Sequence, residues 1–203
     1  MITIIDYGIG NLGSVKNALD KLGADSVISK SETEINKATG LIFPGVGSAT
    51  EGIKNLRKSG LDKVIIDQIK KKKPILGICL GMQLLFTKSE EGNIKCLDII
   101  GGKVKKYKAE LKIPQIGWNQ VKIKNSKLKI KNLFDKIPNN SSFYFVNSYY
   151  FLPKDKSVVI GETEYGINFC SLLVKNNITA TQFHPEKSGP IGLQLIKNWL
   201  KIL

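Results

Sequence analysis

The chain has 203 residues, of which 42% are apolar and 24% charged; this is typical of one globular domain with a full hydrophobic core and excludes a disordered or fibrous protein. Its 31 lysines and arginines against 17 acidic residues give a net charge of +14, but Arg57 is the only arginine. Because base edges and phosphates are read mainly by arginine, we expect no specific nucleic-acid partner.

The sequence carries no sign of a membrane or export segment. No run approaches the roughly 20 apolar residues that span a bilayer. The first residues lack the basic flank and the cleavage site of a signal peptide. We therefore expect a soluble, cytoplasmic protein with no membrane partner.

The cysteines and the single histidine limit the metal chemistry available to the chain. Cys79, Cys96 and Cys170 are an odd number without C-x-x-C spacing, which argues against a disulfide framework and a cysteine-rich zinc site. His184 is the only histidine, so a multi-histidine metal site is excluded too. We expect neither a metal ion nor a cofactor.

Predicted strands and helices alternate over the first ~90 residues, a pattern that indicates βαβ units in an open parallel sheet. Strands are expected at 1–7, 26–29, 41–43 and 74–78, and helices at 12–22, 49–57 and 61–69. The run 74–78 is apolar throughout, as expected for a parallel strand covered on both faces.

The second half changes to short strands with one solvated face. Alternating segments between 103 and 131, such as 102–105 and 119–124, are typical of antiparallel strands. Further strands are expected at 142–150, 157–161, 169–174 and 178–183, before a closing helix with Ile191, Leu195, Ile196 and Trp199. The predicted fold class is α/β: an open, mostly parallel sheet with helices on both faces and an appended antiparallel strand layer, in a single domain over residues 1–203.

A glycine turn follows the first predicted strand. Gly8, Gly10 and Gly13 match G-x-G-x-x-G, and Glu32 follows 19 residues after Gly13, as in a dinucleotide-binding fingerprint. However, Glu32 lies beyond the second predicted strand in a polar run, where an acid typically begins a solvated helix. Two interpretations stay open: a turn that lets strand and helix pack closely, or a nicotinamide or flavin enzyme.

The segment Gly77-Ile78-Cys79-Leu80-Gly81 is stronger evidence for chemistry. A buried strand ends at a cysteine, a helix with Leu84 and Leu85 follows, and glycines two before and two after leave room for a sharp turn. This is a nucleophile elbow with cysteine in place of serine. The N-terminus of the helix favours a thiolate and offers backbone N–H groups to a developing oxyanion.

A cysteine nucleophile needs a base, and His184 follows directly after a predicted strand. Pro185 turns the chain away from that strand, and Glu186 stands two residues on, where it can orient the imidazole. Cys79, His184 and Glu186 therefore predict a catalytic triad. The alternatives are a buried structural cysteine and a non-catalytic binding module.

These segments resemble a known family. Residues 77–83 (GICLGMQ) and 182–186 (QFHPE) resemble the class I, or triad, glutamine amidotransferases. Residues 6–12 (DYGIGNL), 44–47 (PGVG) and 117–119 (GWN) are similar to one branch of it, the glutaminase subunits of imidazole glycerol phosphate synthases. The resemblance covers the whole chain.

The resemblance implies roles for named residues. Cys79 attacks the side-chain amide of L-glutamine; His184, oriented by Glu186, moves the proton; and water hydrolyses the resulting thioester. The implied oxyanion donors are the backbone N–H groups of Leu80 and of the Gly45–Val46 peptide. The implied glutamine-binding positions are Gln83, Glu91 and the main chain around Asn147, Ser148 and Tyr149; those facing a partner are Pro114, Trp118 and Asn119.

The resemblance also implies a partner. In this branch ammonia passes directly into a (β/α)8-barrel cyclase subunit, and the heterodimer makes imidazole glycerol phosphate and AICAR in histidine biosynthesis. Family members usually have histidine where this chain has Gln115 and Asn147. That departure leaves open a paralogous subunit that supplies ammonia for the amidation of surface-polysaccharide sugars.

Most of the excess positive charge lies in one stretch. Residues 103–136 hold eleven lysines against Glu110 and Asp135, a balance of 11 − 2 = +9. Beyond a solvated face, this charge predicts steering towards an acidic partner or a phosphorylated substrate, to be tested by neutralising Lys122, Lys124 and Lys129.

Overall fold

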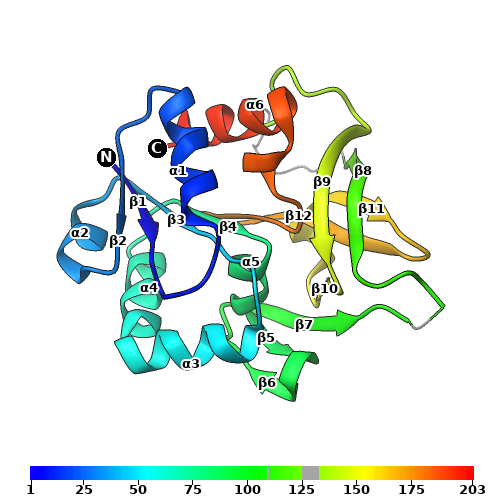
Figure 1. Cartoon of the computed structure of the whole chain (residues 1–203), viewed down its shortest axis with the longest axis horizontal. Coiled ribbons are helices and arrows are strands. Elements are labelled where there is room, and N and C mark those ends of the chain that lie inside the picture. The colour runs from blue at the N-terminus through cyan, green and yellow to red at the C-terminus, as the bar shows by residue number, and fades with distance from the viewer. Residues whose placement is uncertain (109, 125–132) are drawn as a thin grey trace.

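The computed structural model describes residues 1–108, 110–124 and 133–203. The end of the strand-rich stretch expected up to residue 131 lies outside these ranges, as does Lys129. Within the described residues, thirteen strands form one sheet, and helices cover it (Figure 1).

The first half of the chain and one late strand form the parallel part of the sheet. Its strand order is β2-β1-β3-β4-β13, and every neighbouring pair is parallel. The bounds are β1 Ile2–Ile5, β2 Ser26–Ser29, β3 Gly40–Phe43, β4 Ile75–Ile78 and β13 Ile178–Thr181. The predicted open parallel sheet is confirmed.

Helices pack on both faces of this sheet because its strands are apolar on both sides. Ile4 belongs to the same core cluster as α1 and α6 residues, whereas Ile5, its neighbour in β1, belongs to the cluster of α3 and α4 residues. Figure 1 shows α1 and α6 on one side of the sheet and α3 and α4 on the other. The bounds are α1 Leu12–Lys21, α2 Glu32–Lys37, α3 Ala49–Ser59, α4 Leu61–Lys70 and α6 Gly189–Leu200.

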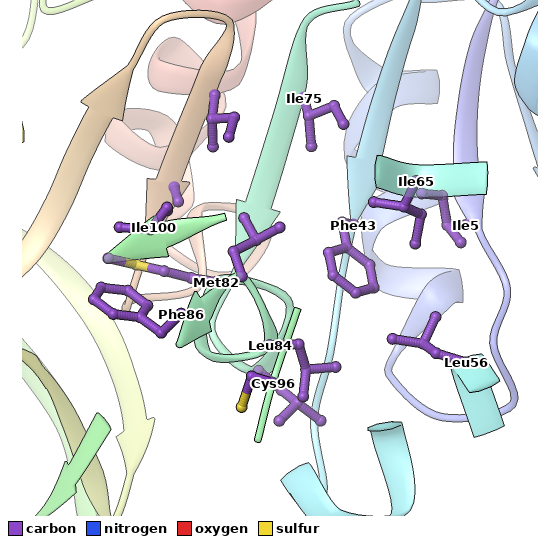
Figure 2. Packing of buried hydrophobic residues seen from close by; sticks show 14 of the residues in the cluster. Ile5, Phe43, Leu56, Ile65, Ile75, Met82, Leu84, Phe86, Cys96 and Ile100 are labelled. Carbon is purple, nitrogen blue, oxygen red and sulfur yellow. The ribbon is translucent and has the colours of Figure 1, made fainter. Parts of the chain in front are cut away.

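The core on the α3 and α4 face extends under the turn that follows β4. Phe43, Leu56, Leu84 and Phe86 are fully buried there, and Figure 2 shows them in one layer of apolar side chains. Burying each such side chain stabilises the fold by about 1.5–3 kcal/mol. This packing fixes the end of β4, where the predicted nucleophile stands.

The antiparallel strands extend the same sheet. From β13 the order continues β12-β10-β7-β5-β6, with only β5 and β7 parallel, while β11, β8 and β9 branch from β12. The bounds are β5 Phe86–Ser89, β6 Ile94–Lys95, β7 Ile100–Lys106, β8 Gln115–Ile123, β9 Ser141–Asn147, β10 Tyr149–Pro153, β11 Val159–Glu164 and β12 Asn168–Lys175.

Some predicted bounds were wrong for local reasons. The single strand expected at 142–150 is two strands, because at Ser148 the chain leaves its pairing with β8 and joins β7 and β12. The strand expected from 157 begins at Val159, since the Asp155 carboxylate caps a short turn at Ser157. The helix expected to include Leu85 is the five-residue α5, Leu80–Leu84, and the strand β5 that follows was not predicted.

Candidate active site

Cys79 stands at a strained turn between β4 and α5. Its φ of 51° and ψ of −106° lie outside the regions that most side chains adopt, which is the geometry of a nucleophile elbow. The turn fits only because residue 81 is glycine: a Cβ there would lie 1.8 Å from the Phe43 carbonyl oxygen. The elbow predicted from the sequence is therefore present.

His184 and Glu186 form a buried pair beyond the end of β13. The imidazole Nδ1 lies 2.8 Å from the Glu186 Oε1, and both side chains are 2% exposed. A carboxylate can only accept, so Nδ1 donates this hydrogen bond, which leaves Nε2 for a second partner. The backbone fixes the ring as well, because the His184 N–H donates to the Tyr144 carbonyl and the Ser188 hydroxyl donates to the His184 carbonyl.

The three residues predicted to form a triad lie close together here, because Cys79 and Glu186 both act on the pKa of the His184 imidazole. Burial alone would lower the pKa of His184, but the interactions with Cys79, followed by those with Glu186, outweigh it. Together they raise that pKa from 6.5 to about 10. The histidine can therefore carry a proton beside the sulfur at neutral pH.

Two groups around the thiol were not found from the sequence. The Gln182 Nε2 donates to Cys79 Sγ at 3.6 Å, and the Val146 carbonyl lies 3.8 Å from the same sulfur. Gln182 precedes His184 by two residues on the same strand end, so the period-two alternation of a strand could have indicated it.

A cleft of about 250 Å³ opens over the sulfur. Its lining contains all five residues expected to bind glutamine, Gln83, Glu91, Asn147, Ser148 and Tyr149, together with Val46, Gly47, Cys79, Leu80, Pro114, Val146 and Gln182. Gln83 is held by Glu91, whose Oε2 accepts from the Gln83 Nε2 at 2.9 Å. His184 and Glu186 are buried and are not part of this lining.

The expected oxyanion segment lies beside the elbow with its carbonyl turned inward. The Leu80 N–H, one of the two expected oxyanion donors, donates to the Gly45 carbonyl at 3.3 Å. This carbonyl belongs to the Gly45–Val46 peptide, whose N–H is the second expected donor. The buried Tyr7 fixes the loop that contains Gly45, since its hydroxyl donates to the Pro44 carbonyl at 2.7 Å. The sequence did not indicate this role of Tyr7.

The residues expected to face a partner lie beside the cleft on β8 and just before it. Pro114 lines the cleft, while Trp118 is 59% exposed and its β8 neighbour Ile116 is 64% exposed. Asn119, in the middle of β8, donates from its side chain to the Glu164 carbonyl at the end of β11. An exposed aromatic and an exposed aliphatic side chain on one strand are typical of a surface that another protein covers.

Gln115 and Asn147, the two departures from the resembled family, are buried neighbours. They pair across β8 and β9 and are 4% and 7% exposed. Both contact the Tyr107 hydroxyl, which donates to Gln115 Oε1 at 3.3 Å and accepts from Asn147 Nδ2 at 3.1 Å. Gln115 therefore lies inside the fold behind the cleft, whereas Asn147 also lines the cleft.

The glycine turn of residues 8–13 packs against the oxyanion loop. A Cβ on Gly10 would lie 3.4 Å from the Gly45 Cα, so the turn lets the two loops approach closely. Glu32 is the first residue of α2 and is exposed, as expected for a solvated helix start. These contacts favour the packing interpretation of the glycine motif over the dinucleotide site.

The described residues contain neither a membrane-spanning helix nor a cluster of metal ligands. No helix in the described ranges is long and apolar enough to cross a membrane. No group of three or more His, Cys, Asp or Glu side chains that could hold a metal ion occurs there either.

Comparisons with known proteins point to one family. The family model for Glutamine amidotransferase class-I matches residues 3–203. The imidazole glycerol phosphate synthase subunit HisH of Dehalococcoides mccartyi is 46% identical over 203 residues, covering 100% of this chain and 97% of the relative. The subunit HisH 2 of Methanococcus maripaludis is 47% identical over 205 residues, covering 99% of each.

Solved structures share the fold. PurLQS from Thermotoga maritima superposes with a TM-score of 0.79 at 17% identity, covering 99% of this chain and 97% of that chain. A crystal structure of a glutamine amidotransferase superposes with a TM-score of 0.78 at 16% identity, covering 100% and 98%. At these identities the likeness concerns the fold alone.

Proposed function

The chain belongs to the class I glutamine amidotransferases, and on this basis we propose that it is the glutaminase subunit of an imidazole glycerol phosphate synthase in histidine biosynthesis. The observation that carries the proposal is the strained elbow that presents Cys79, together with the buried His184–Glu186 pair whose imidazole pKa is raised by Cys79. Relatives with the HisH name match over essentially the whole chain.

The first half-reaction forms a thioester. The Cys79 sulfur attacks the side-chain carbonyl carbon of glutamine and gives a tetrahedral oxyanion. When the C–N bond breaks, His184 transfers its proton to the departing nitrogen, and ammonia leaves. Such proton transfer by a positioned side chain contributes about 10²- to 10⁴-fold to the rate.

The second half-reaction restores the enzyme. His184, now neutral, takes a proton from water as the water oxygen attacks the γ-glutamyl thioester, and glutamate leaves as the sulfur regains its starting state. Glu186 keeps the imidazole in one orientation through both steps, because its carboxylate accepts from Nδ1 and so leaves Nε2 towards the sulfur.

The oxyanion is stabilised by Leu80 and Val46 only after the loop turns. In this structure the Gly45 carbonyl accepts the hydrogen bond of the Leu80 N–H, so this N–H is not free to bind an oxyanion. Rotation of the Gly45–Val46 peptide frees the Leu80 N–H and presents the Val46 N–H. Each oxyanion donor is worth about 10²- to 10³-fold in comparable sites. We propose that the partner subunit drives this rotation.

The partner is a cyclase of the (β/α)8-barrel type that docks over the cleft. The exposed Ile116 and Trp118 support this proposal, because they follow the cleft residue Pro114 along β8 and a subunit that covers them would reach the cleft. Of the lysines considered for steering, Lys124 already pairs with Glu162 at 2.7 Å, which leaves Lys122 the better candidate.

We further propose that residues 1–203 act as one amidotransferase domain in the cytoplasm. One sheet that runs through the whole described chain supports the single domain. The three cysteines, all within the described residues, are free, which suits a reducing compartment.

Reconstitution with the cyclase subunit tests the proposal. Glutamate release from glutamine should rise strongly when the cyclase and its ligand are added, and Cys79→Ala should abolish release while the complex still forms. Persistent turnover in Cys79→Ala contradicts the mechanism. Ammonia transfer to a sugar-amidating enzyme, but not to the cyclase, would instead support the alternative subunit for surface-polysaccharide sugars.

A further inference from the structure

Tyr107 lies immediately after β7 and directly behind the cleft. It is only 3% exposed, and its ring packs against Tyr150, Tyr165 and Phe169 with centroid distances of 5.2 to 5.7 Å. Burial raises the pKa of its hydroxyl, so this group stays neutral and can donate and accept at once. No part of the proposed mechanism uses this residue.

The contacts of Tyr107 converge on the segment expected to hold glutamine. Its backbone N–H donates to the Ser148 carbonyl at 3.1 Å, and its hydroxyl accepts from the Asn147 Nδ2 at 3.1 Å. The same Nδ2 donates to the Tyr149 carbonyl at 2.9 Å. One buried residue thus contacts two of three consecutive cleft residues directly and the third through Asn147.

The orientation of the Asn147 amide depends on these bonds. The Tyr149 carbonyl can only accept, so Nδ2 must face it, and Nδ2 then also faces the Tyr107 hydroxyl. Among the described residues the buried Asn147 Oδ1 has no hydrogen-bond partner. The hydroxyl hydrogen points the other way, towards Gln115 Oε1 at 3.3 Å, which makes the oxygen lone pairs available to Asn147.

We propose that Tyr107 is a positioning residue for substrate recognition: through Asn147 and Ser148 it holds the main chain of residues 147–149 in the conformation that binds the α-amino and α-carboxylate groups of glutamine. This inference rests on the proposed glutaminase function. The segment needs such a support because it is the break between β9 and β10, where the sheet pairing changes. Among the described residues no hydrogen bond joins Tyr107 to Cys79 or His184, so we expect the loss of its hydroxyl to change thiol reactivity little.

Two alkylating probes separate recognition from reactivity. Acivicin carries the α-amino and α-carboxylate groups of glutamine, whereas iodoacetamide has neither and reports only the reactivity of Cys79. Tyr107→Phe removes the hydroxyl and keeps the ring packing. We expect the KI of acivicin to rise about tenfold, which corresponds to ~1.4 kcal/mol, the size of one lost hydrogen bond. The rate of Cys79 alkylation by iodoacetamide should change less than about twofold, because indirect effects of removing one contact are typically a few tenths of a kcal/mol.

Matched variants exclude a merely structural effect. Tyr165→Phe removes a hydroxyl from the same aromatic cluster, where it donates to the Lys112 carbonyl at 2.7 Å, and should leave the KI unchanged. In an Asn147→Leu background, Tyr107→Phe should add little, since both changes remove the same support. Gln115→Met removes only the acceptor of the Tyr107 hydroxyl and should raise the KI by a smaller factor.

The outcomes distinguish this inference from the proposed function. If the wild-type chain shows no saturable acivicin labelling at Cys79, the glutaminase function and the role of Tyr107 both fail. If the wild type is labelled but Tyr107→Phe and Gln115→Met keep its KI, only the role of Tyr107 fails. A parallel loss of acivicin and iodoacetamide reactivity would also overturn it, because Tyr107 would then act on the whole site.

Discussion

A methyl group on residue 81 should destroy the elbow that presents Cys79. The Cβ of Gly81→Ala would lie 1.8 Å from the Phe43 carbonyl oxygen and 2.7 Å from its carbon, whereas real Cβ atoms essentially never come closer than 3.0 Å. The end of β3 and the start of α5 must therefore separate by at least 3.0 − 1.8 = 1.2 Å. Both segments are buried, and the obstacle is backbone, so no flexible side chain can relieve the clash.

Overpacking a well-packed core typically costs about 1–3 kcal/mol, and a clash with backbone lies at or above the upper end. We expect Gly81→Ala to lower the free energy of unfolding by about 3 kcal/mol in urea titrations. We also expect it to slow the labelling of Cys79 by acivicin, by at least the factor that the unfolded fraction of the variant accounts for. The matched control is Gly13→Ala, since a Cβ there meets nothing within 4 Å and its φ is not positive. Wild-type stability and labelling in Gly81→Ala would refute the elbow geometry.

The remaining predictions concern the triad, the other thiols and the docking surface. Glu186→Gln removes one member of a buried pair and should lower the free energy of unfolding by about 3 kcal/mol at neutral pH. Cys79 and then Glu186 raise the folded-state pKa of His184 from 6.5 to about 10, so Glu186→Gln should remove only the Glu186 share of this increase. The deficit should be largest below pH 6.5, where His184 is protonated in both states, and should shrink as the pH rises towards 10; a deficit independent of pH in urea titrations would contradict the pairing. Burial raises the pKa of Cys96 to about 12, so peptide mapping after brief iodoacetamide treatment at neutral pH should find this thiol unmodified. Trp118→Ala should weaken binding of the cyclase subunit by about 30-fold or more, as for an aromatic hot spot, with unchanged stability; equal affinity in a titration would remove Trp118 from the interface.

Most of the fold could be predicted because the apolar pattern and the sheet agree. The run 74–78 was expected to be covered on both faces, and β4 is buried at every position. The break at Ser148 could not be predicted, because residues on either side of it remain strand-like and only the pairing partner changes. The strand β5 follows α5 so closely that no turn signal separates them.

Some residues of the site could also be predicted from the sequence, and others could not. Cys79, His184 and Glu186 could be predicted because glycine spacing and a proline mark their turns in the sequence itself. Tyr107 could not, because it acts through contacts to residues 40 positions away and looks like an ordinary core aromatic. The orientation of the Gly45–Val46 peptide is equally invisible, since the sequence of a glycine-rich loop permits both directions.

The central claim is that Cys79 carries the glutamyl group. Isotope-labelled glutamine should be mixed with the complex of this chain and the cyclase, quenched in acid during turnover, and the peptides examined by mass spectrometry. We expect a γ-glutamyl thioester on the peptide that contains Cys79 and on no other cysteine. Glutamate release without any adduct on Cys79, or an adduct on Cys96 or Cys170, would contradict it.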